Sequence, residues 1–162
     1  MEAAGTVRVV SRTLTDTATL RVGSREDLAA IAELERRGFA RGERWAASEL
    51  ARAIDDERSH CVLAVDGTAV IGYALATRSE DGVEIVGVTV APRWRGRGVG
   101  RRLVESVLVW SGDARVTLEV RVDNEGARAL YASLGFVARG RVAGYYGVHR
   151  DALVMVREAG RP

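Results

Sequence analysis

The feature that most constrains this chain is a glycine-rich loop between a predicted strand and a predicted helix. An apolar run over residues 83–91 ends at Pro92, and every second residue from Gly96 to Gly100 is then glycine. Apolar residues at helical spacing follow as far as Trp110. Glycines let backbone N–H groups approach an anion closely, and a helix start adds unpaired amides. Glycines alone also suit an exposed turn, but the strand–proline–loop–helix order favours a phosphate site.

Two common nucleotide-binding motifs compete for this loop, and neither fits. The loop of nucleoside triphosphatases needs a lysine followed by Ser or Thr, whereas Gly100 precedes Arg101-Arg102. The chain has no lysine, so all 24 lysine-plus-arginine positions are arginine. The dinucleotide fingerprint needs a glycine at its sixth position, where this chain has Arg101. The pattern that remains is Arg95-x-x-Gly98-x-Gly100 among further arginines, which suits a pyrophosphate.

Strand and helix signals alternate along the rest of the chain. Apolar alternation and apolar runs predict strands over residues 18–22, 60–65, 69–77, 83–91, 116–122 and 152–156. We expect helices after the N-cap residue Ser24, over residues 45–54, over residues 98–110, and from Asn124 to a glycine stop at Gly135-Phe136. We expect residues 1–16 to be a flexible extension. Residues 17–158 then form one α/β domain, with a mixed central sheet of about six or seven strands and helices on both faces.

Composition argues against several classes of protein. No apolar run approaches the roughly 20 residues that cross a bilayer, and the start of the sequence resembles no secretory signal, so we expect a cytoplasmic protein without a membrane partner. Arginines alternate with acids at a net charge of +2, unlike the basic stripe of a nucleic-acid binder. One cysteine, Cys61, and two histidines offer no metal-ligand spacing, so we expect no metal. A monomer or weak dimer is expected.

Three residues beyond the loop are candidates for chemistry. Glu119 alternates with Val116, Leu118 and Val120, so its carboxylate faces away from the apolar side of its strand. A carboxylate within a sheet needs a partner or a function, and the pattern alone favours an exposed acid or one in a salt bridge with the nearby arginine. Asn124 precedes a helix and suits an N-cap, while Tyr131 lies on the apolar stripe of that helix, where core packing is the ordinary alternative.

These motifs resemble those of a known family. The segment from Val88 to Gly100, with its Val88-Thr89-Val90 strand end, resembles the acetyl-CoA motif of the GNAT N-acetyltransferases. The Glu119-Val120-Arg121-x-x-Asn124 and Tyr131-x-x-x-Gly135-Phe136 patterns resemble one branch, the RimI-type N-terminal protein acetyltransferases, which act on ribosomal-protein alanine. The resemblance extends from about residue 83 to residue 155. It implies a GNAT-like fold and direct transfer of an acetyl group from acetyl-CoA to an amine.

The resemblance also implies roles for the matching residues. The strand end (Val88, Thr89, Val90) would bind the acetyl and pantetheine portion, and the loop (Arg95, Gly96, Arg97, Gly98, Val99, Gly100) the pyrophosphate. Asn124 would contact coenzyme A, and Glu119 would be the general base, acting through water. Tyr131 would hydrogen-bond the leaving thiolate, because full proton transfer from a phenol near pKa 10 to a thiolate near 8.5 is uphill by roughly 2 kcal/mol.

On the acceptor side, Trp45 and the pair Tyr145-Tyr146 match residues that line the peptide site in the RimI branch. The match is imperfect, since Glu43-Arg44 replaces Phe-Pro before the tryptophan and Gly147 stands where proline is usual. The expected acceptor is the N-terminal α-amine of a protein, such as a ribosomal protein. A small-molecule amine or antibiotic is the alternative within catalysis. A non-catalytic acyl-CoA-binding module is the other alternative, and the retention of Glu119 and Tyr131 argues against it.

Overall fold

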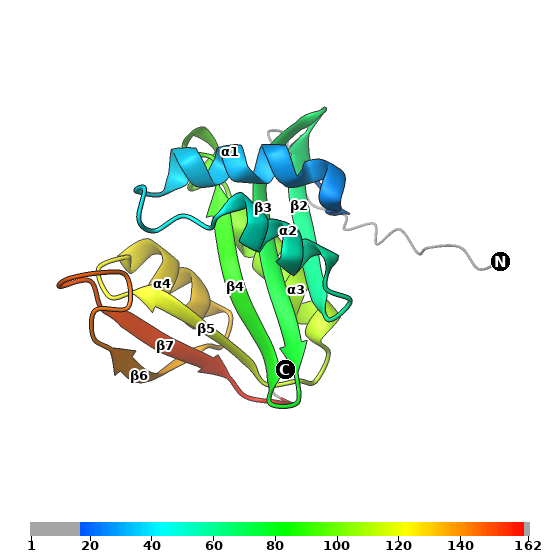
Figure 1. Cartoon of the computed structure of the whole chain (residues 1–162). Coiled ribbons are helices and arrows are strands. Elements are labelled where there is room, and N and C mark those ends of the chain that lie inside the picture. The colour runs from blue at the N-terminus through cyan, green and yellow to red at the C-terminus, as the bar shows by residue number, and fades with distance from the viewer. Residues whose placement is uncertain (1–16, 161–162) are drawn as a thin grey trace.

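One open mixed sheet organises the computed structural model, which describes residues 17–160. Within these residues seven strands lie in the order β1-β2-β3-β4-β5-β7-β6 (Figure 1). The strands are β1 (Thr19–Val22), β2 (Ser59–Asp66), β3 (Ala69–Ser79), β4 (Gly82–Val90), β5 (Val116–Arg121), β6 (Val137–Val142) and β7 (Ala152–Arg157). The helices are α1 (Leu28–Gly38), α2 (Ala47–Asp55), α3 (Val99–Ser111) and α4 (Glu125–Ser133), with short 3-10 turns η1 (Arg25–Asp27) and η2 (Pro92–Trp94).

The sheet has the predicted α/β topology. Strands β1 to β4 pair antiparallel, and α3 then carries the chain to β5, which pairs parallel with β4. Strand β7 lies antiparallel between β5 and β6. The six predicted strands are present, and β6 is an additional edge strand that is exposed along its whole length. The predicted flexible extension, residues 1–16, lies outside the described residues.

The two faces of the sheet carry separate apolar clusters. Helices α1 and α2 cover one face through Ile31, Leu34 and Leu50, and α3 and α4 lie behind the other (Figure 1). The second cluster includes Leu103 of α3 and Tyr131 of α4. The alternation predicted for β5 is confirmed, because Val116, Leu118 and Val120 are buried in this second cluster. Glu119 therefore points to the opposite face, on the side of α1 and α2.

Local signals explain most helix boundaries. The N–H of Ser24 donates to the Asp27 carboxylate at 2.9 Å, although a 3-10 turn precedes the α-helix there. Helix α2 begins at Ala47 rather than at Trp45, because the N–H of Ala46 donates to the Glu49 carboxylate at 2.9 Å and makes Ala46 the N-cap. The glycine stop is confirmed: Gly135 has φ +88°, and the N–H of Phe136 donates to the Tyr131 carbonyl at 3.1 Å.

The sheet opens in its middle, between β4 and β5. These strands pair only at Val83–Val116, Glu84–Thr117 and Ile85–Leu118. Directly after this ladder, a bulge in β4 places Val86 as an extra residue between the partners of Leu75 and Ala76 in β3. Bulges bend strands, and β4 and β5 diverge beyond this point (Figure 1). The site lies in this opening.

Candidate active site

The glycine loop adopts the conformation that its sequence predicts. Gly96 and Gly98 have φ of +71° and +80°, in the left-handed region that favours glycine. Gly98 is the N-cap of α3, and its carbonyl accepts the N–H of Arg102 at 3.1 Å. The amides of the first turn of α3 have no partner within the helix and face outward at its positive end. The loop is therefore built to receive an anion.

A groove of about 800 Å³ runs from this loop along the end of β4 to α4. Of the predicted cofactor residues, those that line it are Val88, Thr89, Val90, Arg95, Gly96, Gly98, Val99, Gly100 and Asn124. Arg97 does not line the groove; its guanidinium lies 5.2 Å from the centre of the Trp94 ring, and Trp94 is a lining residue. The Asn124 side chain accepts the N–H of Ala127 at 3.1 Å, which confirms the N-cap and leaves its amide nitrogen available.

A smaller pocket of about 150 Å³ lies in the opening between β4 and β5. It adjoins the groove, since both are lined by Val88, Thr89 and Asn124. Four predicted residues from distant parts of the chain line this pocket: Trp45, Glu119, Tyr131 and Tyr146. Tyr145 does not line it; the side chain is 52% exposed and packs edge-on against Tyr146, with 4.8 Å between ring centres.

Glu119 has the environment of a general base. Partial burial raises the pKa of its carboxyl, and the negative charge of Glu84 raises it further. The hydroxyl of Tyr146 donates to the Glu119 carbonyl at 3.2 Å and holds the pocket wall against β5. A carboxylate with a raised pKa is a stronger base for a proton that must be removed near neutral pH.

Tyr131 is both a core residue and a residue that lines the pocket, the two alternatives that its sequence position allows. Its ring is buried in the core cluster and packs edge-on against Phe136, with 5.8 Å between ring centres. Tyr131 also lines the pocket that contains Glu119. Burial raises the pKa of its hydroxyl to about 12, so the group stays protonated and acts as a hydrogen-bond donor.

A buried carboxylate that the sequence analysis did not identify, Glu35 of α1, lies against the same pocket. It is 2% exposed and accepts the Tyr73 hydroxyl at 2.7 Å, the Thr89 hydroxyl at 3.0 Å and the Trp45 N–H at 3.3 Å. These bonds tie α1 and the acceptor-side tryptophan to β3 and β4. The available signal was its position seven residues after Leu28, on the apolar stripe of the helix.

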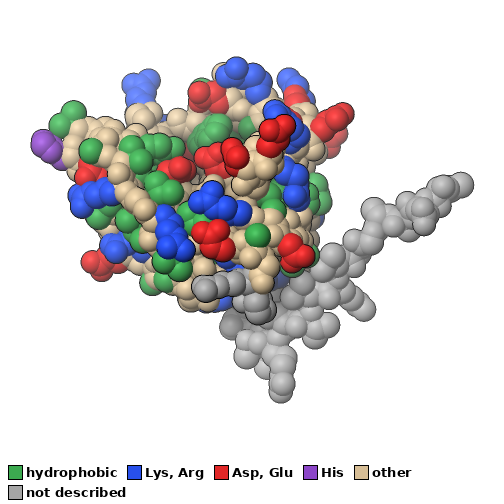
Figure 2. Space-filling model, turned by 90° about the horizontal axis from the view of Figure 1, so that it is seen from below, with side chains coloured by type: hydrophobic (Ala, Val, Ile, Leu, Met, Phe, Trp, Pro, Cys, Tyr) green, Lys and Arg blue, Asp and Glu red, His purple; other side chains and the backbone are tan. Residues whose placement is uncertain are grey.

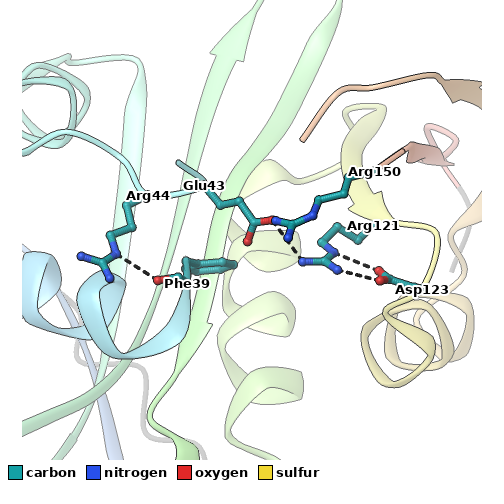
Figure 3. A network of polar contacts seen from close by, with 6 residues as sticks. All are labelled: Phe39, Glu43, Arg44, Arg121, Asp123 and Arg150. Atoms are coloured by element: carbon teal, nitrogen blue, oxygen red, sulfur yellow. Dashed lines mark hydrogen bonds and ion pairs between the residues drawn. The ribbon is translucent and has the colours of Figure 1, made fainter. Parts of the chain in front are cut away.

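Three charged residues, which we call the Glu43 clasp (Glu43, Arg121 and Arg150), lie beside the pocket (Figure 3). The Glu43 side chain is only 6% exposed; it pairs with Arg121 at 3.1 Å and also with Arg150. Arg121 is held from its other side by Asp123 at 2.6 Å. The clasp joins the α1–α2 loop (residues 39–46) to β5 and to the β6–β7 loop (residues 143–151). Glu43 and Arg121 line both the groove and the pocket.

Four further features of residues 17–160 concern metal ligands, the cysteine, surface charge and helix hydropathy. No group of three or more His, Cys, Asp or Glu side chains among residues 17–160 is placed to hold a metal ion. Burial raises the pKa of the Cys61 thiol to about 12, as expected of an apolar core residue. The face in Figure 2 shows arginines and acids interspersed rather than a stripe of one sign. No helix among the described residues is long and apolar enough to cross a membrane.

Comparison with known proteins agrees with this geometry. Residues 25–136 match the model of the acetyltransferase (GNAT) family. The N-alpha-acetyltransferase RimI of Mycobacterium tuberculosis is 35% identical over 91% of this chain and 97% of its own length. The ribosomal-protein-S18-alanine N-acetyltransferase of Escherichia coli superposes with a TM-score of 0.81 at 26% identity, over 90% of this chain and 96% of that one. A chimera of the spermidine N-acetyltransferase SpeG from Vibrio cholerae and hSSAT has a TM-score of 0.69 at 25% identity, over 88% and 96%. The chain is therefore an N-acetyltransferase that belongs to the GNAT family.

Proposed function

We propose that the enzyme transfers the acetyl group of acetyl-CoA to the N-terminal α-amine of a protein or peptide. The observation that carries this proposal is the meeting of the groove with the pocket at Val88, Thr89 and Asn124. An elongated donor in the groove presents its reactive end at this junction. An amine in the pocket then approaches from the side of Glu119 and Tyr131.

The donor side follows from the loop and the end of β4. The amides from Arg95 to Gly100 would bind the pyrophosphate, and the nearby arginines supply charge. Beyond the short β4–β5 ladder, the backbone of residues 88–90 lies along the groove and can hydrogen-bond the pantetheine and acetyl groups. The amide nitrogen of Asn124, whose side-chain oxygen is the N-cap acceptor, adds a donor from the start of α4.

The chemistry requires one base and one hydrogen-bond donor. The amine nitrogen forms a bond to the acetyl carbon as the carbon–sulfur bond breaks, with no acyl-enzyme. Glu119 receives the amine proton through a water molecule, and its raised pKa suits this task. Tyr131 stabilises the leaving thiolate by hydrogen bonding, because a hydroxyl with a pKa of about 12 donates a hydrogen bond more readily than it gives up its proton.

Two considerations favour an N-terminal α-amine as the acceptor. An α-amine has a pKa of about 7.7 to 8, against about 10.4 for lysine, so an appreciable fraction is uncharged near neutral pH and a carboxylate base suffices. RimI-type relatives that are named for N-terminal acetylation align over nearly the whole chain. The similarity to a spermidine acetyltransferase supports a small polyamine as the second candidate. A cytoplasmic setting, where acetyl-CoA and new protein chains are both present, fits either acceptor.

The test is release of coenzyme A with matched acceptors. One peptide carries a free N-terminal alanine and no lysine, a second has the same sequence with a blocked N-terminus and an internal lysine, and spermidine and free lysine complete the set. We expect turnover on the first peptide only, with the acetyl group located on its α-amine by mass spectrometry. The enzyme has no lysine, so acetylation of its own lysines cannot contribute to the signal. Turnover on spermidine alone would assign the second function.

A further inference from the structure

A second carboxylate, Glu84 of β4, stands next to Glu119 on the same face of the sheet. Glu84 pairs with Thr117 in the parallel ladder, so Glu119 is one step further along the same face of β5. The neighbours of Glu84 on its own strand, Val83 and Ile85, point into the core cluster on the opposite face. Glu84 thus lies within the ladder, and Glu119 is the first residue of β5 beyond its last pair, Ile85–Leu118, where the strands diverge.

The two acids differ in their access to solvent. Glu84 is exposed at the surface, whereas Glu119 is half-buried and lines the pocket. Among the described residues, neither acid forms an ion pair with an arginine, while Arg121 on the same strand is engaged by Glu43 and Asp123. The titratable and charged groups that face Glu119 from the surrounding elements are Glu84, Tyr145, Tyr146, Arg121, Glu35, Glu43, Tyr73 and Tyr131. Of the carboxylates in this set, only Glu84 is exposed.

We propose that Glu84 is a positioning residue that shares a proton with Glu119 and passes it from the pocket to solvent, which rests on the proposed role of Glu119 as the base. As the new N–C bond forms, the amine loses one proton, which reaches the Glu119 carboxylate through water. The proton then moves to the Glu84 carboxylate and from there to bulk water. Glu119 is again a carboxylate, and no other atom or electron is exchanged.

The electrostatics of the cluster agree with this placement. The charge of Glu84 raises the pKa of Glu119, after the larger effect of burial. The charges of Glu119 and Glu84 both contribute to the raised pKa of Tyr145 at the pocket rim, so the three side chains lie close to one another. A negative charge next to Glu119 favours the protonated form of its carboxyl, which suits a group that must accept the amine proton.

The direct test is a titration of the Glu119 carboxyl by ¹³C NMR on glutamate-labelled protein. The Glu119 resonance is assigned as the one that Glu119→Gln removes. In Glu84→Gln we expect its titration midpoint to fall by about half a pH unit or more, because a neighbouring negative charge is lost. Glu80→Gln removes an exposed acid from the β3–β4 turn nearby and is the matched control, with no shift expected. An unchanged midpoint in Glu84→Gln overturns the pairing.

Kinetics test the transfer of the proton. Glu84→Ala should lower kcat several-fold, and a high concentration of a small carboxylate buffer should restore it, a rescue that a purely structural role would not give. Glu84→Asp should retain most of the activity. A Glu84→Ala enzyme with wild-type kcat overturns the relay. These outcomes are separable from the proposed function: if the wild type acetylates peptides but Glu84 variants behave as wild type, only the present inference fails.

Discussion

Glu43 and Arg150 pair beside the pocket between β4 and β5 although 107 positions separate them in the sequence. Their loops form two walls of the pocket: one carries Trp45 and the other carries Tyr145 and Tyr146. Internal hydrogen bonds shape the β6–β7 loop: the Gly147 N–H donates to the Gly144 carbonyl at 3.1 Å, and the Arg150 N–H donates to the Gly147 carbonyl at 3.0 Å. The ion pair between Glu43 and Arg150 then attaches this loop to the α1–α2 loop.

Loss of the clasp should weaken acceptor binding. In Glu43→Gln, we expect the KM for the peptide to rise several-fold, with a smaller effect on the KM for acetyl-CoA, because Arg121 and Arg150 lose a carboxylate that is only 6% exposed. Glu33→Gln is the matched control, since Glu33 also pairs with two arginines, Arg36 and Arg37, but on the exposed surface of α1. Equal KM values for the two variants would contradict the role of the clasp.

Glu119→Gln should abolish most of the turnover while the donor still binds. Loss of a general base lowers kcat by about 10²- to 10⁴-fold, and the amide keeps the size of the side chain. Because burial and Glu84 raise the pKa of Glu119, activity of the wild type should decline as the pH falls through that raised value and the base becomes protonated. Steady-state kinetics over pH, together with calorimetry of acetyl-CoA binding, measure both effects. Unaltered kcat in Glu119→Gln would remove the assignment.

Tyr131→Phe separates the core role of the ring from the role of its hydroxyl. The packing of the ring on Phe136 is retained, so we expect a melting temperature close to that of the wild type. Turnover should fall by about 10- to 100-fold if the hydroxyl stabilises the thiolate. Single-turnover kinetics report this step directly, and a normal rate in a stable variant would leave Tyr131 as a core residue only.

Gly98→Ala tests the pyrophosphate loop. A Cβ at Gly98 meets no atom within 4 Å, but its φ of +80° strains a side chain and should shift the loop amides. We expect weaker binding of coenzyme A in calorimetry. Gly67→Ala in the β2–β3 turn carries the same kind of strain, with φ +58° and open space, but lies outside the groove. Only Gly98→Ala should lose affinity; equal affinities would show that the loop does not hold the donor.

Local patterns predicted the parts of the site that lie on regular elements. The alternation of β5 placed Glu119 on the face opposite to Val116, Leu118 and Val120, and the spacing of glycines and proline placed the loop at the start of α3. The sequence Gly135-Phe136 correctly predicted where α4 ends, because the hydrogen bonds that end a helix in this way involve only nearby residues. These predictions succeeded because each physical cause acts within a few residues.

The remaining features depend on contacts between distant segments. The Glu43 clasp joins two loops that are brought together by the order of all the strands in the sheet. The residues next to Glu43 and Arg150 in the sequence therefore do not indicate that these two side chains pair. Strand β6 contains glycine and arginines and is exposed, so it lacks the apolar alternation that marks a strand. The opening in the sheet depends on the register of β4 against β3, where Val86 is the extra residue, and register is a property of paired strands.

The short ladder between β4 and β5 also has a geometric consequence for the two parts of the sheet that it joins. Three residue pairs at one end form the backbone connection between the two parts of the sheet, and the strands separate beyond Ile85 and Leu118. Any rotation of one part of the sheet against the other about this ladder would displace Glu84 least and the strand ends, Val90 and Arg121, most. The separation of those strand ends is therefore set by the angle between β4 and β5. An acetyl group and an amine bound there, as we propose, would both be positioned by this one angle.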